Sequence, residues 1–170
     1  MTERLWTIRL ARLSDCDALS TIEIAAASLF RNADDVSWLA DAPPLPSTLQ
    51  QRLIEHGTVL VATDGKGQPI GFLSADALQD RLHIIEVSVL PDWQRLGIGR
   101  ALIDVAKELA IKHGLRALTL TTFRHLPWNA PFYAELGFEE TEDKALKQHL
   151  DDDATHGLPR EHRCAMALAL

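Results

Sequence analysis

The chain has 170 residues, of which 46% are hydrophobic, and a formal net charge of -7 at neutral pH. This length suits one domain with a well-developed core, so we expect a single domain over residues 1–170. No hydrophobic run approaches the ~18 residues of a membrane span, and the N-terminal residues lack the apolar core of a signal peptide. The negative charge argues against nonspecific nucleic-acid binding. We therefore predict a cytoplasmic protein that binds neither nucleic acid nor membrane.

Hydrophobic periodicity and turn residues predict an alternation of helices and strands. Strands are expected at 6–10, 58–62, 69–75, 82–90, 116–122 and 164–170, with another beginning at Phe138, and helices at 14–30, 47–56, 99–113, 129–136 and 143–150. The alanines of 164–170 leave a helix open as the alternative there. Ser14 or Asp15, and then Ser47, are the expected N-caps of the first two helices. The seven histidines are scattered without the spacing of metal ligands, so no metal site is predicted.

Residues 84–102 are the most informative segment, because they combine a buried strand, a glycine-bearing turn and the start of an amphipathic helix. Gly97 and Gly99 have no Cβ, so the backbone there can approach a ligand closely. The unpaired amides that open a helix, under the positive end of its dipole, bind phosphate groups. The residues after Gly99 match neither a Walker loop nor, with Leu102 at the third position, a dinucleotide fingerprint. A phosphorylated cofactor of another class is therefore expected.

The motif Gln94-Arg95-Leu96-Gly97-Ile98-Gly99 resembles the pyrophosphate loop of the GNAT superfamily of acyl-CoA-dependent N-acyltransferases, whose pattern is Gln/Arg-x-x-Gly-x-Gly/Ala. A second match follows in the expected order, with Asn129 early in a helix, then Tyr133, three residues, and Gly137-Phe138. The resemblance covers roughly residues 6–140. It implies an α/β (α+β) GNAT fold, in which a mixed, mostly antiparallel twisted sheet of about six to seven strands is flanked by helices and its central strands splay apart.

The resemblance also implies acetyl-CoA as the cosubstrate. Its pantetheine arm would pair with the backbone of Val87 and Val89 like an additional strand, and the amides of Leu96 to Arg100 would hold its pyrophosphate. The residues predicted to bind the cofactor are Val87, Val89, Gln94, Arg95, Leu96, Gly97, Ile98, Gly99, Arg100, Asn129 and Phe132.

An amine acceptor must lose a proton before it can attack. A primary alkylamine has a pKa of about 10.4, so only about one molecule in a thousand is uncharged at neutral pH. A carboxylate that faces the acceptor would bind the cation and help to remove its proton. Glu86 is the expected base, and an ion pair with an arginine or exposure to solvent is the structural alternative. His83 is the second candidate, although strand alternation places it on the opposite face unless a bulge intervenes.

The departing thiolate needs a proton, and Tyr133 matches the general acid of the family. The alternative for Tyr133 is a packing role between helix and sheet, like that of its neighbour Phe132. Asn129 is expected to cap its helix and also to contact the cofactor.

These residues predict an N-acetyltransferase that moves acetyl directly from acetyl-CoA to a primary amine. A small-molecule amine is the first acceptor class, and a protein or peptide amine is the second. The alternative from another class is a non-catalytic sensor of acyl-CoA. Residues 31–46, with Trp38 and a proline run, are either an acceptor lid or a surface loop with one helical turn, anchored by the tryptophan. Residues 139–161 either cover the acceptor site or support a homodimer contact.

Overall fold

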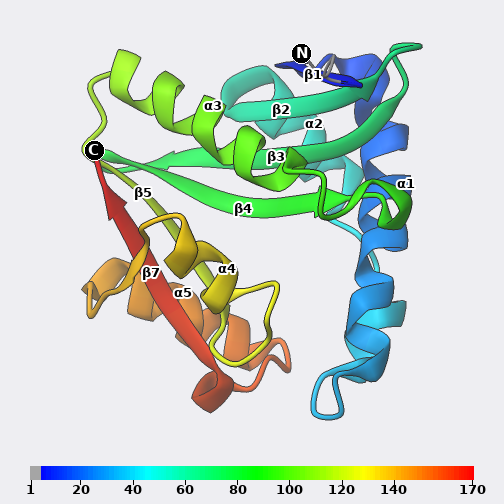
Figure 1. The fold of residues 1–170 in the computed structure, drawn as a ribbon. Coiled ribbons are helices and arrows are strands. Elements are labelled where there is room, and N and C mark those ends of the chain that lie inside the picture. Colours follow the sequence, from blue (N-terminus) through cyan, green and yellow to red (C-terminus); the bar gives the residue numbers. More distant parts are fainter. Residues whose placement is uncertain (1–4) are drawn as a thin grey trace. The chain divides into compact units, whose positions relative to one another are not determined.

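The computed structural model describes residues 5–170. The strands are β1 (Trp6–Leu10), β2 (Thr58–Asp64), β3 (Pro69–Leu78), β4 (Arg81–Val89), β5 (Ala117–Phe123), β6 (Glu139–Glu140) and β7 (Arg163–Ala169). The α-helices are α1 (Cys16–Ala26), α2 (Ser47–His56), α3 (Ile98–Lys112), α4 (Ala130–Glu135) and α5 (Lys144–Thr155). Within this range, seven strands form one mixed sheet in the order β1-β2-β3-β4-β5-β7-β6 (Figure 1).

The contacts divide the chain into two compact units. The first comprises the described residues up to Asp76 together with Glu86–Glu108, and the second comprises Ala77–Ile85 and Leu109–Leu170. Strands β3 and β4 and helix α3 contribute residues to both.

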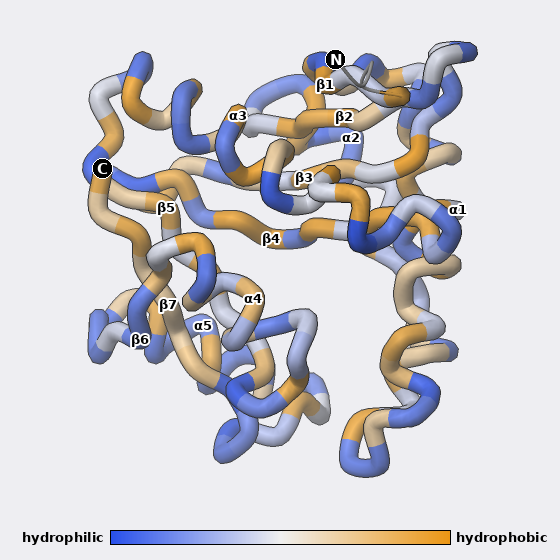
Figure 2. Tube along the Cα trace, viewed as in Figure 1, coloured by the Kyte–Doolittle hydropathy of each residue, from blue (hydrophilic) through white to orange (hydrophobic). Residues whose placement is uncertain are grey.

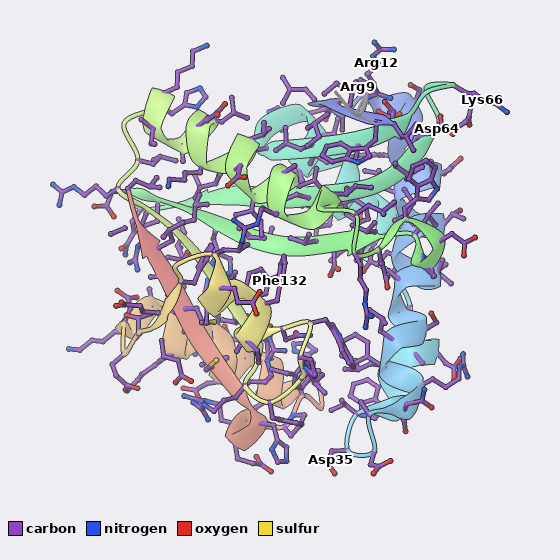
Figure 3. The ribbon with its side chains drawn as sticks, in the orientation of Figure 1. Arg9, Arg12, Asp35, Asp64, Lys66 and Phe132 are labelled. Atoms are coloured by element: carbon purple, nitrogen blue, oxygen red, sulfur yellow. The ribbon has the colours of Figure 1, made fainter. Side chains whose placement is uncertain are left out.

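In the first unit, β2 pairs antiparallel with β1 on one side and with β3 on the other. Its central residues, Val59 to Ala62, are all buried, so both faces of the strand are covered. Figure 2 shows the hydrophobic residues that run along β2 and β3. The connecting turn is held by Asp64, whose Oδ1 accepts the backbone N–H groups of Lys66 and Gln68; Asp64 and Lys66 are labelled in Figure 3.

Helices of the first unit cover opposite faces of the strands. A Cβ on Gly71 of β3 would lie 3.3 Å from Cγ2 of Ile98 on α3, and 3.2 Å from Cγ2 of Val89 on β4. This face therefore lies against α3. Ser74 faces the other way, because side chains alternate along a strand, and its hydroxyl donates to Oε1 of Gln50 on α2 across 3.2 Å. Helices α1 and α2, which pack against each other, therefore form the layer opposite α3.

Helix α1 continues directly into the 3-10 helix Ala27–Asn32. A second 3-10 helix, Ser37–Asp41, follows after a turn and packs against the first (Figure 1). We refer to residues 27–41 as the helical hairpin. Asp35 lies at its turn, as labelled in Figure 3. Val36 is fully buried, whereas Trp38 is 47% exposed. Trp38 is thus only partly covered, and the buried side chains of this segment are the smaller Ala33, Val36 and Ala40.

In the second unit, β5 pairs antiparallel with β7 over its whole length. Its pairing with β4 is parallel and ends at His83 and Thr119, although β5 continues to Phe123. The two central strands therefore share three paired positions, which agrees with the expected splay. Helix α5 packs against β5 and β7, with Leu146 and Leu150 buried in that contact.

Most of the predicted elements are confirmed, with differences at helix ends. The α-helical part of the first helix ends at Ala26 rather than near Phe30, and the chain continues as 3-10 helix. Ser47 is the first residue of α2 and not its N-cap. Asp15 is the N-cap of α1 by position only, because its carboxylate accepts hydrogen bonds from Arg9 and the backbone of Arg12.

Strands β2 and β3 extend beyond their predicted ends, and further differences lie in the C-terminal part. Helix α5 extends to Thr155, beyond the predicted end at residue 150. Residues Arg163–Ala169 form a strand, so the helical alternative is wrong there. Among residues 5–170, no helix has both the length and the apolar character that a membrane crossing requires.

Candidate active site

The glycine-bearing loop lies between the end of β4 and the start of α3. Arg95 and Gly97 both adopt left-handed backbone conformations, with φ of +61° and +82°. Left-handed residues in a turn direct successive backbone N–H groups into a concavity that binds anions. Helix α3 follows at once, since the N–H of Ala101 donates to the carbonyl of Gly97 across 3.0 Å. The loop therefore combines turned amides with the N-terminus of a 15-residue helix.

Gly97 is required for its backbone conformation. A Cβ at this position would meet no atom within 4 Å, so crowding within the protein is not the reason for glycine. The sequence predicts that the absent Cβ permits close approach of a ligand. The structure shows that glycine is also needed here for its positive φ. The space above Gly97 is open, so a ligand has room to approach the loop amides.

The loop carries positive charge in a chain whose net charge is -7. Arg95 and Arg100 are exposed, and neither forms an ion pair with another side chain among the described residues. A hollow of about 310 Å³ adjoins the loop; the described residues that line it are Trp6, Leu96, Gly97, Arg100, Ala101 and Asp104. Free guanidinium groups beside turned amides fit a phosphorylated ligand, because both donate hydrogen bonds to phosphate oxygens.

Gln94, the first residue of the motif, has a structural task in addition to its predicted one. Its Nε2 donates to the carbonyl oxygen of Val89 across 3.0 Å, which ties the loop to the end of β4. The carbonyl oxygen of Val89, a residue whose backbone is predicted to pair with a ligand, therefore already accepts one hydrogen bond within the protein. A carbonyl oxygen has two lone pairs, so this bond does not prevent a second.

Glu86 is half-buried on β4 and shares one side of the strand with Ser88, whose hydroxyl donates to Glu86 Oε1 across 2.7 Å. Burial, and then the charge of Glu23, raise the pKa of Glu86 to about 8, while the hydrogen bond from Ser88 acts in the opposite direction. No ion pair among residues 5–170 includes Glu86. The alternative that it pairs with an arginine is therefore not found, and a carboxyl group that can take up a proton near neutral pH is present.

Glu23 on α1 is the residue that sequence reasoning missed. Its two carboxylate oxygens each lie 3.1 Å from the backbone nitrogen of Leu45, which donates to them. Burial raises the pKa of Glu23. The available signal was an acidic residue between Ile22 and Ile24, beside the buried face of the helix.

His83 is placed in the second unit, within a structural cluster. Its Nδ1 lies 3.0 Å from the Thr119 hydroxyl, and its ring stacks on His149 of α5 with centroids 4.9 Å apart. Burial, followed by the charges of His149 and Arg81, lowers the pKa of His83 to about 4. These contacts favour a neutral packed histidine over a catalytic base.

Tyr133 lies in an aromatic cluster of the second unit. Its ring is edge-on to Phe132 and Phe138, with centroids 5.2 Å and 5.7 Å away. Gly137 has φ of +96°, and the N–H of Phe138 donates to the carbonyl of Tyr133 across 3.1 Å. These are the features of a Schellman helix end, in which the residue after the glycine also packs on the last turn. The spacing from Tyr133 to Gly137-Phe138 therefore has a structural cause of its own.

Asn129 does not cap α4 with its side chain, contrary to the prediction. Its Oδ1 accepts the hydroxyl hydrogen of Thr122 across 2.6 Å, which fastens the start of α4 to β5. No partner among residues 5–170 takes its Nδ2 hydrogens, so these remain able to contact a ligand. Phe132 lies on α4, as labelled in Figure 3, and is half-buried.

An anion-binding loop at the N-terminus of a long helix, next to a strand that carries a protonatable carboxyl group, indicates a group-transfer enzyme with a phosphorylated cosubstrate. Comparison with known proteins identifies the family. The family described as Acetyltransferase (GNAT) family matches residues 24–138, and the chain belongs to it.

Individual relatives agree with this family. The uncharacterized N-acetyltransferase CT2212 of Chlorobaculum tepidum is 26% identical over 158 residues, which span 92% of this chain and 90% of that protein. The uncharacterized N-acetyltransferase MJ1207 of Methanocaldococcus jannaschii is 37% identical over 83 residues, 45% of this chain, but the match spans only 37% of that protein. The fold is similar to that of the PaiA N-acetyltransferase of Thermoplasma acidophilum in complex with coenzyme A, with a TM-score of 0.72 and 16% identity over 97% of this chain and 99% of that chain.

Proposed function

We propose that this chain transfers an acetyl group directly from acetyl-CoA to the primary amine of a small molecule. The observation that carries the proposal is the loop at residues 94–100. It has two left-handed residues, open space above Gly97, and two arginines that form no ion pair with the described residues 5–170. In a member of the GNAT family, this combination suits the diphosphate of coenzyme A.

The loop would bind and orient the cosubstrate. Backbone N–H groups of Leu96 to Arg100 would donate to the diphosphate, and the guanidinium groups of Arg95 and Arg100 would offset its charge. Acetyl-CoA supplies an activated thioester carbonyl. Asn129 and Phe132 of the second unit are further proposed contacts, together with the backbone of Val87 and Val89.

Glu86 would accept the proton of the acceptor amine. With a pKa raised to about 8, its carboxyl group is mostly protonated at pH 7 in the absence of a ligand. The positive charge of an arriving ammonium group favours the carboxylate form, so binding of the acceptor releases the proton of Glu86. The carboxylate then takes a proton from the ammonium group, which exposes the nitrogen lone pair for attack.

Tyr133 would supply the proton that the departing thiolate needs. A thiol has a pKa of about 8.5, so the donor accelerates the reaction without being indispensable. General acid–base assistance of this kind contributes about 10²–10⁴ in rate. The aromatic contacts of Tyr133 with Phe132 and Phe138 would hold its ring in one orientation.

A thiol-release assay with acetyl-CoA and a panel of amines tests the proposal. We expect turnover with at least one small primary amine, and higher kcat/KM for it than for a peptide with a free N-terminus. Higher kcat/KM for the peptide would instead indicate that the acceptor is a protein or peptide amine. Tight binding of acetyl-CoA without turnover on any amine would overturn it in favour of an acyl-CoA sensor.

A further inference from the structure

Glu86 projects from β4 into the layer that α1 and α2 form on one face of the strands. Val89 lies on the opposite face, since its Cγ2 and Ile98 of α3 both flank Gly71. The hydrogen bond between Ser88 and Glu86 shows that these two side chains share the other side of the strand. The same side of the neighbouring strand β3 carries Ser74, which contacts Gln50 of α2.

Glu23 enters this layer from α1. It lies beside the buried face of the helix, which is formed by Leu19, Ile22 and Ala26. Both of its carboxylate oxygens accept from the backbone N–H of Leu45 at 3.1 Å. This contact closes the base of the helical hairpin, because it joins the residues before and after 27–41. The carboxylate is therefore held in one place on the side of the layer from which the hairpin extends.

No ion pair among residues 5–170 includes Glu23 or Glu86, and each is half-buried. After burial, the charge of Glu23 is the second cause that raises the pKa of Glu86. Two like charges in a partly desolvated space are unfavourable, and a bound cation relieves the repulsion. One ammonium group can satisfy one carboxylate, whereas a ligand with two can satisfy both.

We propose that Glu23 determines acceptor specificity, by binding a second ammonium group of an alkyl diamine whose other nitrogen reacts at Glu86. This inference rests on the proposed function and names the acceptor class for the same site. Glu23 takes no part in proton transfer. Its task is to hold the end of the acceptor that does not react, so its loss raises KM for diamines and leaves the chemical step intact.

The test compares putrescine with butylamine, which has the same four-carbon chain and one ammonium group. For the unaltered protein we expect kcat/KM about tenfold or more in favour of putrescine, the range of one charge-assisted hydrogen bond. Measured at a pH above the pKa of Glu86, where its ionisation no longer limits the rate, Glu23→Gln should abolish this preference through a higher KM for putrescine, with kcat for butylamine nearly unchanged. The glutamine retains an oxygen for the N–H of Leu45. Asp17→Asn, on the exposed side of α1, is the matched control and should keep the preference.

Calorimetric titration of putrescine into the complex with coenzyme A separates this inference from the proposed function. Putrescine binding that weakens about tenfold in Glu23→Gln supports the role of Glu23, even if no amine is acetylated. Butylamine acetylation without any preference for putrescine would overturn the inference and leave the proposed function standing. Equal loss of activity on both amines in Glu23→Gln would also overturn it.

Discussion

Ser88 donates its hydroxyl hydrogen to Oε1 of Glu86 across 2.7 Å, and both residues lie on one side of β4. This bond favours the carboxylate, whereas burial and the charge of Glu23 favour the protonated form and raise the pKa to about 8. With this balance the carboxyl group can take up a proton near neutral pH, and a bound cation would favour its carboxylate form. Such a group is suited to exchange a proton with an ammonium substrate.

Glu86→Gln should lower kcat/KM by about 10²–10⁴, because glutamine has nearly the same shape but cannot accept the proton. The affinity for acetyl-CoA should stay the same, since the loop that binds it is untouched. Thiol-release kinetics and calorimetry measure the two quantities. An unchanged kcat/KM would remove Glu86 from the role of base.

The activity should rise with pH through the pKa of Glu86. Because that pKa is raised to about 8 in the free protein, kcat/KM should be low at pH 6 and increase until Glu86 is ionised. Glu23→Gln removes a like charge, so its rising limb should lie at lower pH for the same acceptor amine. Superimposable pH profiles of the two proteins would show that Glu23 does not act on Glu86.

Tyr133→Phe should lower kcat by about 10²-fold or more, while the dissociation constant of acetyl-CoA stays unchanged. Phenylalanine keeps the edge-on contacts with Phe132 and Phe138, so only the hydroxyl is lost. Single-turnover kinetics and calorimetry measure the effects. A kcat equal to that of the unaltered protein would assign Tyr133 to packing alone.

Asp15→Asn should lower the free energy of unfolding by about 1–3 kcal/mol at pH 7. Asp15 is buried, and it accepts hydrogen bonds from both terminal nitrogens of Arg9, at 2.7 and 2.9 Å, which hold its pKa below the ordinary value. A lowered pKa contributes stability above the unfolded-state value of about 3.9, and this contribution is lost as pH falls towards the native value. Urea unfolding at pH 7 and pH 3 should therefore show a smaller difference at pH 3. Asp17→Asn, which is exposed, should change little at either pH.

The motif regions could be predicted well because their structure depends on nearby residues. The pattern from Tyr133 to Gly137-Phe138 ends α4 by contacts within six residues, and the glycine supplies the left-handed conformation that ends the helix. Gly97 likewise supplies a left-handed conformation, in the turn that leads into α3. The order of helices and strands follows from similarly local periodicity.

Contacts between residues far apart in the sequence could not be predicted. Glu23 and Leu45, 22 residues apart, meet only because the helical hairpin folds back between them. Whether Glu23 and Glu86 face the same layer depends on which face of the strands α1 covers. Asn129 was expected to cap its helix, but the Thr122 hydroxyl on β5 competes for the same oxygen. These choices are made by tertiary packing, which a single sequence does not display.

Gly97 and Gly67 form a matched pair for testing the loop. Their φ values are +82° and +80°, and a Cβ on either would meet no atom within 4 Å. Alanine should therefore strain both positions similarly, by about 1–2 kcal/mol. Gly67 lies in the turn between β2 and β3, whereas Gly97 lies in the proposed diphosphate loop.

Calorimetric titration of acetyl-CoA into the unaltered protein, Gly67→Ala and Gly97→Ala tests the account most directly. It should give equal affinities for the first two and an affinity at least about tenfold weaker for Gly97→Ala. No heat of binding with the unaltered protein, or one affinity shared by all three, would contradict the assignment of residues 94–100 as the coenzyme A loop.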